Sequence, residues 1–254
     1  MITTEKHGPV AVVTLDRPHA RNALTGAMVQ SMKETYADCD ADESVRVVVL
    51  TGRDPAFCAG LDLKDLSSTY DQVGTTPSGA DGRVGFPRPD KPLIGAINGP
   101  AVTGGLELAL GCDFLIASER ATFADTHARV GVMPAGGLTI RLPQLVGINR
   151  ARQMSLTGDF VDAVRACEWG LVNEVVPHPE LLGRAAELAR SVSGIDPGAI
   201  SELRAMYRAL ALRADDEAYV EEARWSRRWM RGHFDADALS TRRASIIERG
   251  SSQQ

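Results

Sequence analysis

The stretch KPLIGAINGPAVTGGLELALGCDFLIA, residues 91–117, decides the fold class of this chain. It opens with KPLIGAING, an apolar run typical of a strand that is buried on both faces of a sheet. The run VTGGLELALG follows with a helical pattern, and CDFLIAS then has the pattern of a strand. Strands that alternate with helices predict crossover units and parallel pairing. We therefore expect an α/β fold.

The residues before this stretch extend the same pattern. VRVVVLTG at 45–52 is almost entirely apolar and β-branched, so it predicts another strand buried on both faces. A helix is expected from Thr25, its N-cap, to Asp38. Residues 2–5 and 10–15 are β-type runs separated by the turn signal KHGP, and they predict an opening hairpin.

The residues after this stretch divide the chain into two parts. ATFA predicts a short strand, and from about residue 136 the sequence is mostly helical, with one strand in NEVVP and a helix over 179–193. The break SGIDPG then precedes long polar helices that reach residue 249. We expect a core over 1–195 and a C-terminal helical subdomain over 196–254.

The segment 67–90 is expected to form a long surface loop. It is rich in Gly, Pro, Ser and Asp and has no apolar period. Because it is too long for an ordinary connection between two elements, we interpret it as a mobile lid beside a site.

Composition excludes several classes of protein. The chain has 254 residues, a formal net charge of −5 and no long basic run, so a nucleic-acid or anionic-membrane surface is not expected. No window approaches the roughly 18 apolar residues that span a bilayer, and the N-terminus lacks a signal-peptide pattern. The four cysteines are far apart, which predicts free thiols, no metal site and a cytoplasmic location.

Two glycine-containing turns stand before expected helices. FCAGLD at 57–62 places the amide of Leu61 after Gly60, and TGGLE at 103–107 places the amide of Gly104 in the first turn of a helix. Such amides can bind a carbonyl oxygen as it becomes an oxyanion, and preorganised donors of this kind stabilise that charge by several kcal/mol. Alone, each turn is more often only a strand terminus, because glycine-rich turns before helices are common, so both interpretations stay open.

Glu107 lies about one turn after Gly104 on a helix that is otherwise apolar. A carboxylate there is costly to bury unless it is paired or faces a cavity. It is either a general acid/base beside an oxyanion site or an ordinary solvent-facing glutamate.

These motifs together resemble the crotonase family, the enoyl-CoA hydratase/isomerase superfamily. The resemblance covers nearly the whole chain through VAVVTLDRPHARNALT, FCAGLDL, the stretch 91–117, ATFA, RVGVMPAGG followed by RLPQLVG, and LTGDFVDAVRACEWGLVNEVVP. It implies a spiral of ββα units with a C-terminal helical segment. It also implies acyl-CoA thioester substrates, no cofactor other than the coenzyme A of the substrate, no metal, and homotrimers or hexamers built as dimers of trimers.

Carried over by position, the resemblance places the oxyanion-hole amides on Leu61 and Gly104 and the first catalytic glutamate on Glu107. The second glutamate of the hydratases falls on His127, so an imidazole stands where a carboxylate is expected. Arg249 falls where the family has a lysine that contacts the CoA phosphates, although it could equally be an exposed arginine at a helix end. The remaining residues expected to contact substrate flank the two turns: Ala59, Gly60, Asp62, Leu63 and Gly105.

The resemblance implies an enoyl-CoA hydratase that adds water across the 2,3 double bond of an enoyl thioester. His127 could hold water when neutral or donate a proton when charged. The alternatives are another crotonase reaction, namely isomerisation or thioester hydrolysis, and a non-catalytic acyl-CoA-binding protein. Dehalogenase chemistry is disfavoured because Ala135 occupies the position of its nucleophilic aspartate, and His127 could also be a catalytically silent buried residue.

Overall fold

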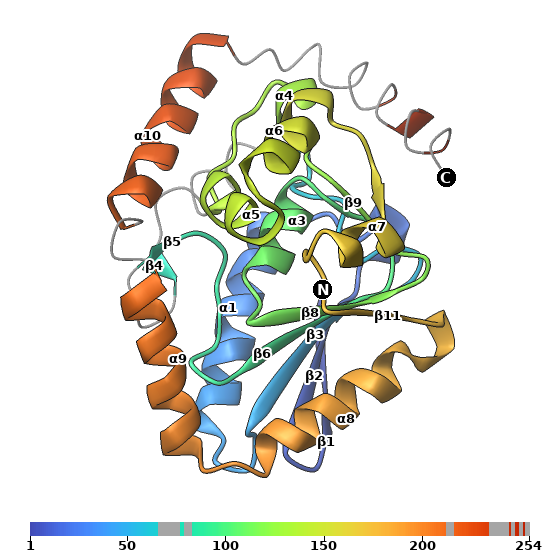
Figure 1. The fold of residues 1–254 in the computed structure, drawn as a ribbon, viewed down its shortest axis with the longest axis vertical. Helices are drawn as coiled ribbons and strands as arrows, with labels where there is room; N and C mark the ends of the chain where they lie inside the picture. Colours follow the sequence, from blue (N-terminus) through green and yellow to red (C-terminus); the bar gives the residue numbers. More distant parts are fainter. Residues whose placement is uncertain are drawn as a thin grey trace.

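Two β-sheets of unequal size form the centre of the molecule (Figure 1). The larger sheet has the order β1-β2-β3-β6-β8-β11, with β1 antiparallel to β2 and every other pair parallel. The smaller sheet has the order β10-β9-β7, and β4 pairs with β5. This computed structural model describes residues 1–65, 77–78, 83–211, 216–233, 244, 247–248 and 251.

The strand bounds are β1 Ile2–His7, β2 Val10–Leu15, β3 Val47–Gly52, β4 Pro77–Ser78, β5 Arg83–Val84, β6 Leu93–Ile97, β7 Ala101–Val102, β8 Phe114–Ser118, β9 Thr122–Ala124, β10 Val161–Asp162 and β11 Glu174–Val176. The helix bounds are α1 Gly26–Ala41, α3 Gly104–Leu110, α4 His127–Val130, α5 Leu138–Val146, α6 Ile148–Thr157, α7 Ala163–Glu168, α8 Leu181–Ser193, α9 Pro197–Ala211 and α10 Asp216–His233. Pro18–Ala20 and His178–Glu180 are short 3-10 helices, η1 and η2.

The two sheets are built by a repeated strand–strand–helix unit. β6 joins the larger sheet, β7 joins the smaller one, and α3 follows; β8, β9 and α4 repeat this order. Successive units stack in parallel, since β7 pairs in parallel with β9 and Cys58 forms a parallel bridge with Ala101. The expected spiral of ββα units is therefore confirmed.

Both faces of the central strands of the larger sheet, β3 and β6, are buried, as the apolar runs predict. All six residues of β3 are buried, with Val47 and Val49 packed in the same cluster as Leu181 and Ala185 of α8. The alternate residues of β3 belong to the main core together with α1 and α3. Figure 1 shows α8 crossing one face of this sheet while α1 lies on the other. This two-sided burial explains why these strands lack an alternating polar pattern.

The predicted elements differ from the observed ones mainly at their ends. Thr25 caps α1 by accepting a hydrogen bond from the Met28 amide, as expected, but the helix continues past Asp38 to Ala41. The opening strand extends through His7, so only the following Gly-Pro forms the turn. Short strand β7, which is only two residues long, was not predicted from the sequence.

Part of the expected long loop is ordered. Residues 77–78 and 83–84 form a two-stranded antiparallel ladder, and Phe86 is buried in the main core. Residues 67–76 and 79–82 of that expected loop lie outside the described part of the chain. The division into domains at residue 195 stays a prediction.

The four cysteines are free thiols, as predicted. Cys39 and Cys58 are buried, whereas Cys112 and Cys167 are only partly buried. Within the described ranges, no helix is both long and apolar enough to cross a membrane.

Gly105 and Gly183 offer a matched test of the packing between successive units. A Cβ added at Gly105 would lie 2.1 Å from the Cys58 carbonyl oxygen, whereas one added at Gly183, on α8, would meet nothing within 4 Å. We expect Gly105→Ala to lower the free energy of unfolding by more than about 2 kcal/mol, because backbone atoms must move apart. Gly183→Ala should be neutral or stabilising by up to about 1 kcal/mol. Urea denaturation measures both, and equal stability of the two variants would contradict this packing.

Candidate active site

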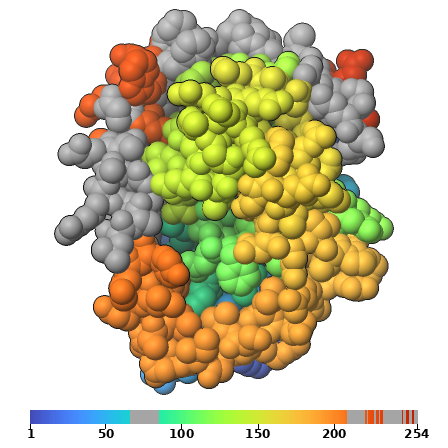
Figure 2. Space-filling view, in the orientation of Figure 1, coloured from blue at the N-terminus to red at the C-terminus, as the bar shows by residue number. Residues whose placement is uncertain are grey.

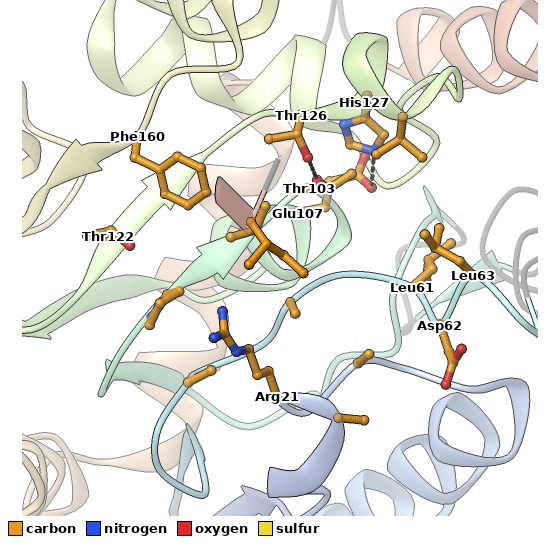
Figure 3. Close-up of a pocket in the computed structure, with 18 of the residues that line it drawn as sticks. Arg21, Leu61, Asp62, Leu63, Thr103, Glu107, Thr122, Thr126, His127 and Phe160 are labelled. Carbon is orange, nitrogen blue, oxygen red and sulfur yellow. Dashed lines mark hydrogen bonds and ion pairs between the residues drawn. The ribbon is translucent and has the colours of Figure 1, made fainter. Parts of the chain in front are cut away.

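A cavity of about 1040 Å³ lies where the turns after the strands of the smaller sheet meet. Its walls come from segments far apart in the sequence: the 17–23 turn, the 59–64 turn, the start of α3, and the residues around α4. Figure 3 shows Glu107 and His127 facing each other on one side, with Leu61 and Leu63 at one end and Phe160 and Thr122 at the other. The cavity is large enough for an extended small-molecule ligand.

The register of the smaller sheet brings the two predicted oxyanion turns together. Cys58 pairs with Ala101, and in each segment the amide in question lies three residues further on, at Leu61 and Gly104. A Cβ added at Gly104 would lie 3.5 Å from the Leu61 nitrogen, so the two amides are close neighbours. The parallel pairing thus places equivalent points of successive units side by side.

A positive φ precedes each of these amides. Gly60 has φ +98°, and Thr103 has φ +56°. Glycine adopts such a conformation freely, whereas a β-branched residue does so at a cost of about 1–3 kcal/mol. Strain of this kind is concentrated at functional sites, and here it turns the amide of Gly104 out of the smaller sheet.

Neither the Leu61 amide nor the Gly104 amide donates a hydrogen bond to any of the residues that the structure describes. Gly104 is the first residue of α3, so its N–H has no acceptor in the helix. Residues 62–65 contain a turn at 63–64 and a bend at 65, so the helix expected directly after Leu61 does not begin within them. The two donors lie side by side where Leu61 and Thr103 line the cavity, and such a pair of unpartnered amides can bind an oxyanion.

Glu107 is buried beside these amides. Its side chain is 4% exposed, which rules out the solvent-facing alternative. Oε1 accepts hydrogen bonds from the amides of Gly136, at 2.6 Å, and Ala135, at 3.2 Å. These bonds fix the carboxylate and leave Oε2 directed toward His127 (Figure 3).

His127 connects two carboxylates. Its Nε2 lies 3.5 Å from Glu107 Oε2, and its Nδ1 lies 2.6 Å from Asp125 Oδ1. Asp125 Oδ1 also accepts the backbone N–H of His127, at 3.2 Å, so one oxygen holds both the ring and the main chain. All three side chains are at least nine-tenths buried. A buried group of ionisable residues that faces a cavity is typical of a catalytic site.

The surroundings of His127 favour its protonated form. Burial by itself lowers the pKa of the ring, but the negative charge and hydrogen bond of Asp125, together with those of Glu107, outweigh burial and raise this pKa to about 10. Burial likewise raises the pKa of Asp125, yet the charge and hydrogen bonds of His127 bring it below the usual value. We conclude that His127 is an imidazolium and Asp125 a carboxylate at neutral pH.

The cavity has one apolar and one polar end. Val130, Val132 and Leu63 belong to an apolar cluster at one end, against which Met230 of α10 also packs. Arginine side chains, among them Arg21 and Arg120, line the other part. Between the two ends the hydroxyls of Thr103 and Thr126 lie 2.5 Å apart and share a hydrogen bond. This arrangement suits a ligand with an apolar tail and a polar, anionic carrier.

The other residues predicted to contact substrate are placed unevenly. Ala59, Asp62 and Leu63 line the cavity, and the carboxylate of Asp62 pairs with Arg17 at 2.6 Å. Gly105 instead has its Cα against the Cys58 backbone. Gly60 acts through its φ angle on the Leu61 amide. Arg249 lies outside the described residues, although Ile247 and Ser251 beside it line the cavity.

Several residues that build this site were not predicted from the sequence. The Ala135 and Gly136 amides that hold Glu107 belong to the motif PAGG, whose glycines were a visible signal for a tight backbone approach. Asp125 could be recognised only as a neighbour of His127, because the sequence does not show which side chains point inward. Thr103 gave no signal, since its positive φ is a property of the folded chain.

Among the described residues, no group of three or more His, Cys, Asp or Glu is arranged to hold a metal ion.

Two free amides beside a buried carboxylate and imidazolium define an enzyme site that stabilises an oxyanion while moving protons nearby. The similarity of this chain to known proteins agrees with this class of enzyme. The sequence matches the family described as enoyl-CoA hydratase/isomerase over residues 5–230. The chain belongs to this family.

Individual relatives cover most of the chain. It is 41% identical over 202 residues to a probable peroxisomal enoyl-CoA hydratase 1 of Arabidopsis thaliana, covering 80% of this chain and 76% of that one. It is 37% identical to a carnitinyl-CoA dehydratase of Citrobacter koseri, covering 84% and 82%. The crystal structure of an enoyl-CoA hydratase from Mycobacterium avium superimposes with a TM-score of 0.81 at 47% identity, covering 90% and 96%.

Asp125→Asn tests the cause of the raised His127 pKa. Removing the charge of Asp125 takes away the largest favourable contribution to the imidazolium, so we expect the His127 pKa to fall well below about 10. An NMR titration of the ring signals measures it, with His178, which lies against Ser118 and Asp54, as the internal control. An unchanged His127 pKa in Asp125→Asn would contradict the assignment.

Proposed function

We propose that this protein is an enoyl-CoA hydratase, a hydro-lyase that adds water across the 2,3 double bond of an enoyl-CoA thioester. The observation that carries the proposal is that the unpartnered amides of Leu61 and Gly104 lie side by side at the wall of the cavity that Glu107 and His127 also line. The thioester oxygen lies between the amides, which stabilise it as charge develops in the enolate. The relatives named as hydratases and dehydratases support this reaction class.

Glu107 and His127 divide the proton transfers of hydration between them. Glu107, held by the Ala135 and Gly136 amides, accepts a proton from water as the water oxygen bonds to the β-carbon. The π electrons move toward the thioester and form the enolate bound by the two amides. The His127 imidazolium then donates its Nε2 proton to the α-carbon, and the enolate collapses to the 3-hydroxyacyl thioester.

The same contact restores the site after turnover. At the end of the reaction Glu107 carries one additional proton and His127 lacks one. Because Glu107 Oε2 and His127 Nε2 are only 3.5 Å apart, the proton passes between them directly or through one water molecule. Asp125 keeps the ring oriented throughout, since it holds both Nδ1 and the backbone N–H of His127.

The charge state of His127 suits the proton donation that hydration requires. The raised pKa makes the ring an imidazolium at neutral pH, which can donate a proton to the α-carbon but cannot itself activate water. Hydrolysis with Glu107 as the base would differ in its product, free coenzyme A. Dehydration is the reverse of the same step and uses the same residues in exchanged roles.

The family resemblance and the surface of the molecule also suggest its substrate class and its oligomeric state. The substrate brings its own coenzyme A, so no separate cofactor takes part, and the apolar end of the cavity accommodates the acyl chain. A homotrimer, alone or paired into a hexamer, is supported by the family resemblance and by exposed apolar side chains on α6, α7 and α9, such as Leu156, Val164 and Tyr207. The cytoplasm is the proposed location.

Turnover of crotonyl-CoA and longer enoyl-CoAs tests the proposed function directly. Loss of the enoyl-thioester absorbance, with formation of a 3-hydroxyacyl-CoA, is the expected result. The purified 3-hydroxyacyl-CoA, incubated with the enzyme, should be dehydrated and so increase this absorbance. Tight binding of CoA esters without turnover at any chain length would identify a non-catalytic binder. Release of free coenzyme A in place of the hydroxyacyl thioester would identify a hydrolase.

Glu107→Gln should lower kcat by about 100- to 10,000-fold, because the amide cannot accept the proton of water. Glu34→Gln, an identical change on the exposed face of α1, is the matched control and should leave kcat unchanged. Steady-state rates with crotonyl-CoA measure both variants. A Glu107→Gln variant that retains wild-type kcat would remove Glu107 from the mechanism.

The pH profile tests His127 as the proton donor. The imidazolium is present below its pKa and is lost as pH rises through it, so kcat/KM should fall only as the pH approaches about 10. His127→Gln should lower kcat by roughly 100-fold and abolish this basic limb. Initial rates between about pH 6 and pH 10.5 give both results. If His127→Gln keeps the rate and the limb of the wild type, His127 is a structural residue.

A further inference from the structure

Glu222 of the C-terminal helix α10 reaches into the turn next to the active site. Its Oε2 accepts the N–H of Gly137 at 2.8 Å, and its Oε1 accepts the N–H of Thr139 at 2.9 Å together with the Thr139 hydroxyl. Gly137 and Thr139 begin α5, which has no side-chain cap from its own neighbourhood. A residue some 80 positions away in the sequence therefore supplies the cap of this helix.

The turn at 135–139 is held by two carboxylates from two different helices. Glu107 of α3 accepts the amides of Ala135 and Gly136, and Glu222 of α10 accepts those of Gly137 and Thr139. Four amides within five consecutive residues thus point at two carboxylates. The two groups are also close enough to interact through their charges, since Glu107 contributes to raising the pKa of Glu222.

The backbone contact between Glu107 and this turn leaves little room for movement. A Cβ added at Gly136 would lie 3.0 Å from the carboxyl carbon of Glu107, so the main chain of the turn rests directly on the catalytic side chain. Any shift of the turn would change the position of Oε2, which faces His127 at 3.5 Å. Displacements of about 1 Å at a reacting group can cost roughly 100-fold in rate.

We infer that Glu222 is a positioning residue for Glu107: by holding the amides of Gly137 and Thr139, it fixes the turn whose preceding amides orient the catalytic carboxylate. The inference rests on the proposed role of Glu107 in hydration. It also gives α10 a part in catalysis, because the helix that contributes Met230 to the apolar end of the cavity sets the geometry of the base through Glu222.

The ionised side chain suits this role better than a neutral one. A carboxylate offers one acceptor oxygen to each of the two amides, whereas an amide side chain would turn an NH₂ group toward one of these donors. An anion at the N-terminus of α5 is also favoured by the helix dipole. Burial is the main factor that raises the pKa of Glu222, and the charge of Glu107 adds to it, so mild acid weakens this anchor before it protonates an ordinary surface carboxyl.

Glu222→Gln and Asp196→Asn form a matched pair for the test. Asp196 Oδ1 accepts the Ala199 amide at 2.8 Å at the start of α9, so it caps another C-terminal helix but does not line the cavity. Both changes convert a capping carboxylate to an amide of equal size. The readouts are kcat and KM with crotonyl-CoA, the pH profile of kcat/KM, and the melting temperature of each variant.

We expect Glu222→Gln to lower kcat by roughly 10-fold with a smaller change in KM, because the turn positions the base and does not bind the coenzyme A carrier. The fall of kcat/KM in mild acid, the acid limb of the profile, should be weakened in Glu222→Gln, because in the wild type protonation of Glu222, whose pKa is raised by burial and by the charge of Glu107, releases the turn. Asp196→Asn should keep the wild-type kcat and the wild-type limb. If both variants only lose melting temperature and keep the wild-type kcat, Glu222 is merely a helix cap and the inference is wrong.

A folded Glu222→Gln variant with wild-type kcat and an unchanged acid limb would overturn the inference. If this variant does not fold, Glu222→Asp decides the question, because it keeps the charge but is too short to hold both amides. Its kcat should fall, and a wild-type kcat would again overturn the inference. Failure of the wild-type enzyme to hydrate any enoyl-CoA is a different result, which removes the proposed function itself.

Discussion

The burial of the Glu107 carboxylate is the constraint on which the rest of this site depends. A carboxylate inside a protein must be satisfied by hydrogen bonds or by a cation, because removal from water costs several kcal/mol per ion. Here one oxygen is satisfied by the amides of the 135–136 turn and the other faces the imidazolium of His127. Three other features act on this carboxylate. The 135–139 turn supplies its amide donors, the His127–Asp125 pair supplies the facing cation, and α10 holds the turn through Glu222.

The stacking of strand–strand–helix units explains how such distant residues meet. Parallel pairing aligns Cys58 with Ala101 and Ala101 with Phe123, so the positions three residues later, Leu61, Gly104 and Thr126, also lie side by side. The first two supply the amides of the oxyanion site, and the third brings its hydroxyl against that of Thr103. His127 is the next residue. The catalytic geometry is therefore a direct product of the register of the smaller sheet.

The sequence predicts this arrangement only in part, and the division has a physical cause. Buried strands, the Thr25 cap and the glycine turns depend on neighbours within a few residues, so their patterns are visible in the chain. The order and spacing of whole motifs then identify the family. The hydrogen bonds of Glu222 and the positive φ of Thr103 arise from tertiary packing, and no local pattern records them. Asp125 could be predicted only in part. The sequence shows that it lies two positions before His127, but it does not show that its side chain points toward the His127 ring.

The charge balance of the site explains how an imidazole can stand where the related hydratases are expected to have a second glutamate. Asp125, Glu107 and Glu222 already bring three carboxyl groups to one buried region, and the charge of Glu107 raises the pKa of Glu222. A fourth carboxyl at position 127 could serve as proton donor only in its neutral form. An imidazolium paired with the Asp125 carboxylate has the same net charge as that neutral acid and the same single proton to give. The Asp125–His127 pair, taken as a unit, is therefore the electrostatic equivalent of the missing glutamic acid, and the two residues are expected to be functional only together.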